Sequence, residues 1–256
     1  MNNIYRSILI ALSLITLTIW YTKRKKTKKQ TSTDILVVGT NAEFPPFSFM
    51  ENNIIVGFDI DIIKEVAYRL GKKITIKDMP FDALIPDIQL GNIQIIAAGM
   101  SPTLERAKRI FFTDPHLTNN PLVIVTLANK KTISGITDLI DKEVAVNEGY
   151  SSDLYMSTIE GPILIRLSSA SIGDGILALT SGRVDAFVSA QAAIAPFFKK
   201  HDKQKFQIIP IPKTDEPDAL AISKKYPALF EQIQKILTAM NQDGSLEKIK
   251  KKWGLA

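Results

Sequence analysis

Two segments of the chain carry the side chains that point most directly to a function. Residues 38–49 read Val-Gly-Thr-Asn-Ala-Glu-Phe-Pro-Pro-Phe-Ser-Phe, and residues 98–108 read Ala-Gly-Met-Ser-Pro-Thr-Leu-Glu-Arg-Ala-Lys. Each follows an apolar run that is typical of a buried strand, and the second contains Arg106. An arginine offers a carboxylate a permanently charged, planar partner. The pair therefore favours a cleft for a small carboxylate over a catalytic centre.

The residue types that support other chemistry are few. The chain has no cysteine, which excludes disulfides, thiolate metal sites, a cysteine nucleophile and a lipidated cysteine. Its two histidines, His116 and His201, lie in no recognisable metal-binding pattern. Neither a phosphate loop nor a dinucleotide fingerprint is present. We therefore expect no metal, no cofactor and no enzymatic activity.

The apolar pattern predicts the α/β elements that would position these residues. A strand at 35–39 is followed by a helix at 58–70, a strand at 73–77, a helix at 81–90 and a strand at 93–98. Residues 41–49 are expected to be a loop because of the two prolines. A similar order restarts at residue 122, so we predict two lobes with mostly parallel sheets. Ligands bind at the carboxyl ends of such strands.

The two units also predict domain bounds. We expect residues 35–117 and 218–256 to form lobe 1 and residues 122–212 to form lobe 2. Hinges are expected near residues 118–121 and 213–217, where the chain crosses between the lobes.

The N-terminus differs in composition from the rest of the chain. Residues 1–30 hold seven basic and no acidic side chains, which leaves 25 basic against 26 acidic in the remainder. A body so close to neutral argues against nucleic-acid binding. Residues 8–21 are almost wholly apolar, which is typical of a signal-peptide core. We predict a signal peptide or an uncleaved membrane anchor at residues 1–22 and a basic linker at residues 23–34.

Five motifs in the same order carry a resemblance to a known family. They are Gly39-Thr-Asn-Ala-Glu-Phe-Pro-Pro-Phe, Val56-Gly-Phe-Asp-Ile-Asp, Phe81-Asp-Ala-Leu-Ile-Pro, Gly99-Met-Ser-Pro-Thr-Leu-Glu-Arg, and Asp243-Gly-Ser with Lys251-Lys-Trp-Gly. Over roughly residues 34–254 the chain resembles the polar amino-acid-binding proteins of ABC importers, in the glutamine-, histidine- and arginine-binding group. The resemblance implies a two-lobed periplasmic-binding-protein-like fold of type II, with mixed sheets flanked by helices and a ligand cleft between the lobes.

The same resemblance implies a place and a partner. We expect a monomer in the periplasm or another extracytoplasmic space, which hands a polar amino acid such as arginine or glutamine to an ABC permease in the inner membrane. Residues 4–22 would tether it if they are not cleaved. The basic run at 23–29 instead favours a cytoplasmic body by the positive-inside rule, so the orientation stays open.

The resemblance implies that nine residues of this chain lie at the ligand, because they match the family's binding positions. Arg106 would bind the carboxylate, with Ser101 and Gly99 in the same pocket. The others would be the apolar walls Phe44 and Phe81, the side-chain partner Asn41, the second-lobe residues Ser151 and Ser152, and Gln191. Each has a plainer alternative as a core, turn or surface residue, and Thr103 is expected to cap the helix of Arg106. Tyr150 is expected to rim the cleft.

Two positions depart from the family pattern. Relatives carry an acid after the strand at 185–189 that pairs with the ligand's ammonium group, and here the residue is Ala190. Asn41 likewise stands where many relatives have an aspartate. A buried ammonium without an anion is costly, and Gln191, Glu43 and Glu148 are the substitutes that we consider.

Two alternatives remain from the sequence. A prephenate- or arogenate-type dehydratase on the same fold would use Arg106 for a substrate that lacks an amine, although we find no candidate general acid. A membrane-tethered sensor domain would use the uncleaved anchor.

Overall fold

A computed structural model describes residues 35–129, 132–200 and 203–256. The predicted signal peptide or anchor at 1–22 and the linker at 23–34 lie outside the described residues. Among the helices of the described part, none has the length and apolar character needed to cross a bilayer.

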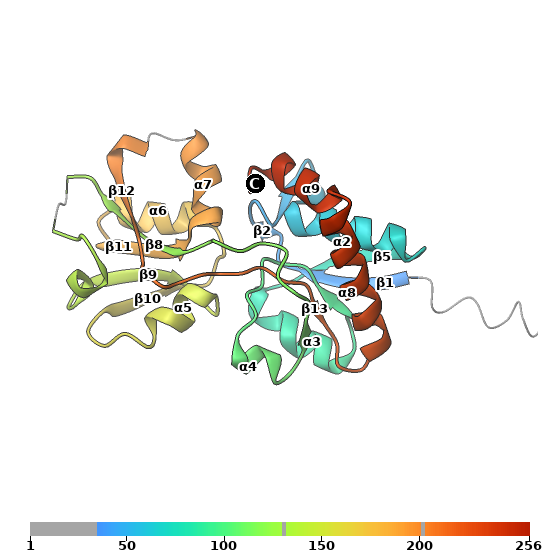
Figure 1. The fold of residues 1–256 in the computed structure, drawn as a ribbon. Helices are drawn as coiled ribbons and strands as arrows, with labels where there is room; N and C mark the ends of the chain where they lie inside the picture. Colours follow the sequence, from blue (N-terminus) through green and yellow to red (C-terminus); the bar gives the residue numbers. More distant parts are fainter. Residues whose placement is uncertain (1–34, 130–131, 201–202) are drawn as a thin grey trace, which may run out of the picture.

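Two five-stranded mixed sheets form the centres of two lobes that lie side by side (Figure 1). The first sheet has the strand order β5-β1-β6-β13-β7, and the second has the order β10-β9-β11-β8-β12. In each sheet the first three strands are parallel and the fourth is antiparallel to both of its neighbours. The predicted α/β class and the two lobes are confirmed.

The strands of the first sheet are β1 (Ile35–Thr40), β5 (Lys73–Asp78), β6 (Ile95–Ile96), β7 (Phe111–Phe112) and β13 (Ala221–Ile222). Those of the second are β8 (Leu122–Leu127), β9 (Glu143–Asn147), β10 (Ile163–Leu167), β11 (Ala186–Ala190) and β12 (Phe206–Pro210). Three central strands, β6, β11 and β13, are buried at every residue. They are continuous apolar runs because helices cover both faces of each sheet.

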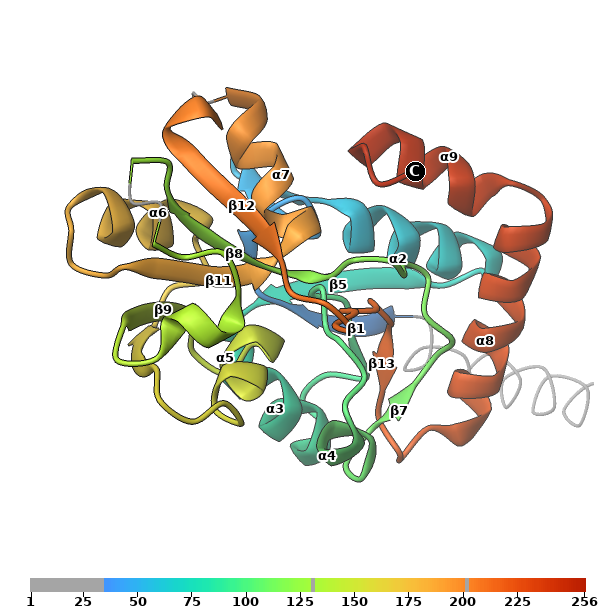
Figure 2. The ribbon, with the colours of Figure 1, turned by 60° about the vertical axis from the view of Figure 1, so that its left-hand side comes forward.

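The helices of the first lobe are α2 (Phe58–Arg69), α3 (Leu84–Leu90), α4 (Leu104–Ala107), α8 (Pro227–Gln242) and α9 (Ser245–Trp253). Those of the second are α5 (Ser151–Met156), α6 (Ile172–Thr180) and α7 (Gln191–Lys200). Short 3-10 turns are η1 (Phe81–Ala83), η2 (Ile136–Leu139) and η3 (Lys203–Lys205). Figure 2 shows α2, α8 and α9 together on one side of the first sheet and α3 on the other.

Two sequence expectations about local structure were incomplete. The predicted loop at 41–49 contains β2 (Glu43–Phe44) and the start of β3 (Ser48–Glu51). β2 pairs with β3, and β3 pairs with β4 (Ile54–Val56). The two prolines occupy only the turn between β2 and β3, where a strand hydrogen bond is not needed. The sequence also did not predict β10 or α7, whose short patterns are ambiguous between strand, helix and loop.

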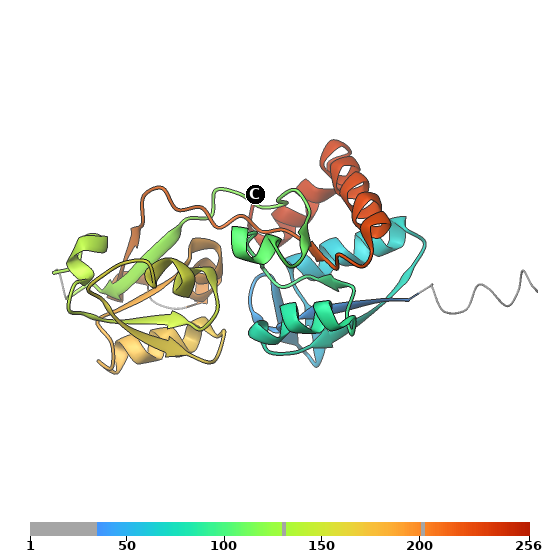
Figure 3. The ribbon, with the colours of Figure 1, turned by 90° about the horizontal axis from the view of Figure 1, so that it is seen from below.

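Two chain segments cross between the lobes and pair with each other (Figure 3). The Glu216 backbone N–H donates to the Asn120 carbonyl at 2.8 Å, and the Asn120 side-chain amide donates to the Glu216 carbonyl at 3.2 Å. Leu117 and Asp218 form an isolated antiparallel bridge. The residue bounds predicted for the lobes and hinges remain our proposal.

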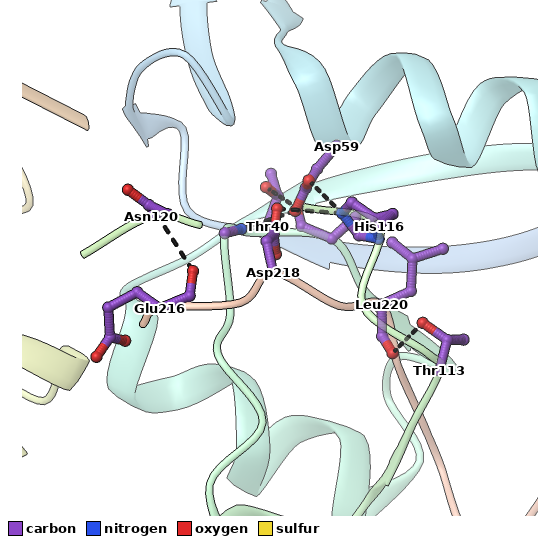
Figure 4. A network of polar contacts seen from close by, with 10 residues as sticks. Thr40, Asp59, Thr113, His116, Asn120, Glu216, Asp218 and Leu220 are labelled. Atoms are coloured by element: carbon purple, nitrogen blue, oxygen red, sulfur yellow. Dashed lines mark hydrogen bonds and ion pairs between the residues drawn. The ribbon is translucent and has the colours of Figure 1, made fainter. Parts of the chain in front are cut away.

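A buried charge cluster lies at the first-lobe end of these crossing segments (Figure 4). The Nε2 atom of His116 is 3.1 Å from a carboxylate oxygen of Asp59 and 3.1 Å from one of Asp218. Burial opposes the charged imidazole, yet the adjacent carboxylates of Asp218 and Asp59 raise the pKa of His116 to about 10. Within the described residues, only these three side chains are spaced to hold a metal ion. Nε2 of the protonated imidazole contacts both carboxyl groups, while burial and the charge of Asp59 raise the pKa of Asp218. We therefore interpret the cluster as an ion-pair network in which His116 and Asp59 carry the charges.

The cluster also holds the loop that precedes Arg106. The other carboxylate oxygen of Asp59, at the start of α2, accepts a hydrogen bond from the Gly99 backbone N–H at 2.7 Å. Asp59 is therefore contacted by His116 from the crossing segment and by Gly99 from the loop after β6. This arrangement fixes the carboxyl end of β6 relative to the first crossing segment.

Candidate functional site

Arg106 lies buried between the two lobes. Thr103 caps its short helix α4, since the Thr103 hydroxyl accepts from the Arg106 N–H at 3.2 Å, as the sequence predicted. The guanidinium donates to the carbonyl of Ser101 at 2.8 Å and to the carbonyl of Gly149, in the second lobe, at 2.9 Å. Its side chain lies over the ring of Phe81, 5.4 Å from the centroid. Burial lowers the pKa of Arg106 to about 10, so the group remains a cation at neutral pH.

A carboxylate that the sequence did not single out lies in the same part of the cleft as Arg106. Glu216, on the second crossing segment, accepts a hydrogen bond from the Ser101 hydroxyl at 2.8 Å and another from Ser151 of the second lobe. Burial raises the pKa of Glu216, while these hydrogen bonds and the charge of Arg106 oppose that rise. In Figure 4 its side chain points away from the ion-pair network. The available signal was an acidic residue on a segment predicted to cross the cleft.

Three aromatic rings form the opposite part of the site. Tyr150 stacks on Phe81 with ring centroids 4.0 Å apart and an interplanar angle of 21°. It also packs at a tilt against Phe44, with centroids 4.9 Å apart. Its hydroxyl donates to the side-chain oxygen of Asn41 at 3.0 Å, and burial raises the pKa of Tyr150. Tyr150 is only 7 % exposed, so it lies inside the cleft and not at its rim.

Gly99 is needed for both its backbone and its size. Its φ of +62° lies in the left-handed region, which side chains other than glycine rarely adopt. A Cβ atom there would lie 3.0 Å from ring atoms of Phe44 and Phe47. The glycine thus lets the loop after β6 approach the aromatic wall while its N–H reaches Asp59.

Two predicted site residues lie apart from this group. Ser152 is buried in the first turn of α5 and does not hydrogen-bond to Arg106 or Glu216. Gln191 begins α7, its backbone N–H donates to the Pro121 carbonyl at 2.9 Å, and it lines a separate cavity beside α7 and β12. Arg106, Ser101, Gly99, Phe44, Phe81, Asn41 and Ser151 are brought together.

A cavity of about 470 Å³ opens beside the aromatic group. Tyr150 and Phe81 form part of its wall, and so does Asn41. Its remaining polar lining is strongly acidic: Glu43, Asp78, Asp82 and Glu148. A cation would be attracted to this part of the cleft.

These features define the class of protein. Two lobes with the same sheet topology, joined by two crossing segments and holding a buried arginine between them, form a solute-binding protein. The model of the bacterial extracellular solute-binding proteins, family 3, matches residues 36–256, and the chain belongs to this family. Members of the family act outside the cytoplasm, bind small amino-acid ligands and work with ABC transporters.

Known relatives agree with this assignment. The chain is 30 % identical to the arginine-binding extracellular protein ArtP of Bacillus subtilis over 85 % of each chain. It is 29 % identical to ABC transporter arginine-binding protein 1 of Escherichia coli, over 84 % of this chain and 88 % of the relative. An ancestral arginine-binding protein bound to arginine superposes with a TM-score of 0.80 at 35 % identity, over 86 % of this chain and 98 % of that one. These relatives are binding proteins and not enzymes, and the sequence-based family, fold class and binding function are confirmed.

Proposed function

We propose that the cleft binds the zwitterionic part of an α-amino acid, with Arg106 for the carboxylate and Glu216 for the ammonium group. The observation that carries this proposal is the position of Ser101 between them. Its carbonyl accepts from Arg106 and its hydroxyl donates to Glu216. A fixed cation and a fixed anion on two sides of one residue match the two charges of an amino acid.

Glu216 resolves the departure noted at Ala190. Ala190 ends β11, and two residues later the backbone N–H of Ala192 donates to the side-chain oxygen of Asn120 at 2.8 Å. Asn120 in turn pairs with the backbone of Glu216. The crossing segment is therefore next to the strand end where relatives carry their acid. A carboxylate supplied from position 216 offsets the cost of burying the ligand's ammonium group.

The biological role follows from the family and from the two-lobed architecture. We infer that the ligand closes the lobes because it contacts Arg106 and Ser101 on one side and Ser151 on the other only in the closed state. The closed protein, a monomer, delivers the amino acid to an ABC permease in the inner membrane. Residues 4–22 tether it on the extracytoplasmic side of that membrane.

Calorimetry with the common amino acids on the full chain, kept in mild detergent, tests the ligand. We expect one or a few polar amino acids to bind, and Arg106→Ala to weaken this binding about 100-fold or more, as when one partner of a buried charge pair is removed. Arg109→Ala is the matched control, since Arg109 lies three residues away and is exposed. A wild-type protein that binds no amino acid would contradict the proposal.

A second titration separates the ammonium contact from the carboxylate contact. Glu216→Gln should weaken an amino acid about 10-fold or more but leave its deaminated analogue nearly unchanged, because the analogue lacks the ammonium group. Glu231→Gln makes the same charge change at an exposed position of α8 and should affect neither ligand. Equal losses for both ligands in Glu216→Gln would assign Glu216 another role.

Protease treatment tests the place of the protein. If the body lies outside the cytoplasm, protease added to cells with a permeable envelope but an intact inner membrane should degrade it. Protection under that condition would favour the cytoplasmic orientation that the basic run at 23–29 suggests.

A further inference from the structure

Tyr150 occupies the part of the cleft where a ligand side chain is expected. Phe44 and Phe81 are the apolar walls proposed for that side chain, and Asn41 is its proposed polar partner. Tyr150 contacts all three, at ring distances of 4.9 and 4.0 Å and a hydroxyl distance of 3.0 Å. The phenol thus makes the contacts that the side chain of a bound amino acid would make.

From this juxtaposition we propose that Tyr150 determines which side chains the cleft accepts, by competing with the ligand for the space between Phe44 and Phe81. The inference rests on the proposed function and goes beyond it. An amino acid with a small side chain needs only the Arg106 and Glu216 part of the site. A longer side chain must displace the ring, and it loses affinity by the cost of that displacement.

The loop that carries Tyr150 is linked to the carboxylate site. The carbonyl of Gly149, the residue before it, accepts a hydrogen bond from the Arg106 guanidinium at 2.9 Å, and the Gly149 N–H donates to the Asp153 carboxylate at 3.0 Å. A ligand carboxylate that takes the Arg106 nitrogen removes the first of these two contacts. Carboxylate binding therefore releases one of the bonds that hold the Tyr150 ring in place.

The acidic lining of the cavity predicts which long side chains bind best once the ring is displaced. It begins at Tyr150 and Phe81, and its lining includes Glu43, Asp82 and Glu148. A long side chain that passes between the two phenylalanines ends among these carboxylates. A cationic end would gain from them, whereas a neutral end would not.

A size series of ligands and variants tests the competition. The full chain and its variants Tyr150→Phe, Tyr150→Leu and Tyr150→Ser are titrated with glycine, alanine, glutamine and arginine. Wild type should have a lower arginine-to-alanine affinity ratio than the Tyr150 variants. The affinity of Tyr150→Ser for arginine should rise about 10- to 100-fold, because arginine no longer has to break the ring contacts and the hydrogen bond of Tyr150. Its affinity for glutamine should rise less. Its affinity for glycine and alanine should rise less than its affinity for arginine.

The other variants keep the test independent of one unstable protein. Arginine affinity should rise from Tyr150→Phe to Tyr150→Leu to Tyr150→Ser, as the side chain becomes smaller. Tyr155→Ser changes a tyrosine within α5, the helix that follows Tyr150, and should leave the order of ligands as in wild type. Thermal unfolding of each variant identifies any that does not fold.

The outcomes separate this inference from the proposed function. An arginine-to-alanine affinity ratio that is the same in wild type and in the folded Tyr150 variants would overturn the inference while amino-acid binding stands. Absence of amino-acid binding in wild type and all variants would contradict the proposed function itself. Binding of arginine by Tyr150→Ser but not by wild type would support the inference most strongly.

Discussion

The two lobes have the same sheet topology but contribute different kinds of residue to the cleft. In the first lobe, the loop after β6 carries Gly99, Ser101 and Arg106, which form fixed contacts. In the second lobe, the equivalent strand β11 ends at Ala190, which has no polar side chain. The loop after β9 instead places the ring of Tyr150 inside the cleft.

This comparison separates scaffold from specificity. The shared topology brings equivalent strand ends to one cleft, so either lobe is able to supply recognition groups. In this chain the first lobe supplies the charge, a crossing segment supplies Glu216, and the second lobe supplies a side chain that occupies space. Each prediction below changes one side of the comparison.

The largest effect is expected at the ion-pair network of the first lobe. His116→Gln removes the buried cation that pairs with Asp59 and contacts Asp218, which should lower the free energy of unfolding by roughly 3–5 kcal/mol. The pKa of His116 is raised from 6.5 to about 10 in the folded protein. Its contribution is therefore complete below about pH 6.5 and is lost as the pH rises through about 10. Urea unfolding of wild type and His116→Gln across this range measures the free energy of unfolding. The same change of that free energy with pH in both proteins would contradict the prediction.

An intermediate effect is expected from two glycines, one in a cleft loop of each lobe. Both have left-handed backbones, with φ of +62° at Gly99 and +75° at Gly149. Only at Gly99 would a Cβ meet nearby atoms, at 3.0 Å from Phe44 and Phe47. Gly99→Ala should cost roughly 2–4 kcal/mol of stability and Gly149→Ala about 1 kcal/mol. Denaturant unfolding of both variants measures these losses of stability. Equal losses would contradict the difference in packing between the two loops.

The smallest effect is expected from restoring an acid to the second lobe. Ala190→Asp in the Glu216→Gln protein should recover amino-acid affinity by roughly 10-fold, about one charge-assisted hydrogen bond. Ala195→Asp, on an exposed position of α7, is the matched control and should recover none. Calorimetry measures the amino-acid affinity of the two double variants, and equal recovery in both would indicate a general effect of negative charge.

Local patterns predicted most of the fold and the loop that carries Arg106. The helix and strand periods placed Gly99, Ser101 and Arg106 at one strand end, and the Thr103 cap follows from neighbouring residues alone. Glu216 and the position of Tyr150 depend on how two lobes and two crossing segments pack. No local period encodes such contacts, so the sequence placed Tyr150 at the rim and did not single out Glu216. It also did not indicate that Asp59, His116 and Asp218 meet, because they are far apart in the chain.

The position of β13 in the first sheet has a consequence for how the chain becomes folded. This strand lies between β6 and β7, yet it follows every strand of the second sheet in sequence. The second lobe can therefore form as soon as β12 has been synthesised, whereas the first lobe lacks an internal strand until residue 222 is available. Until then the edges of β6 and β7 are unpaired and open to association with other chains. When the whole chain refolds, pairing of β13 with β6 must also close a loop that contains the entire second lobe, so pulsed hydrogen exchange should protect β8 to β12 before β6. Simultaneous protection of both sheets would contradict this order.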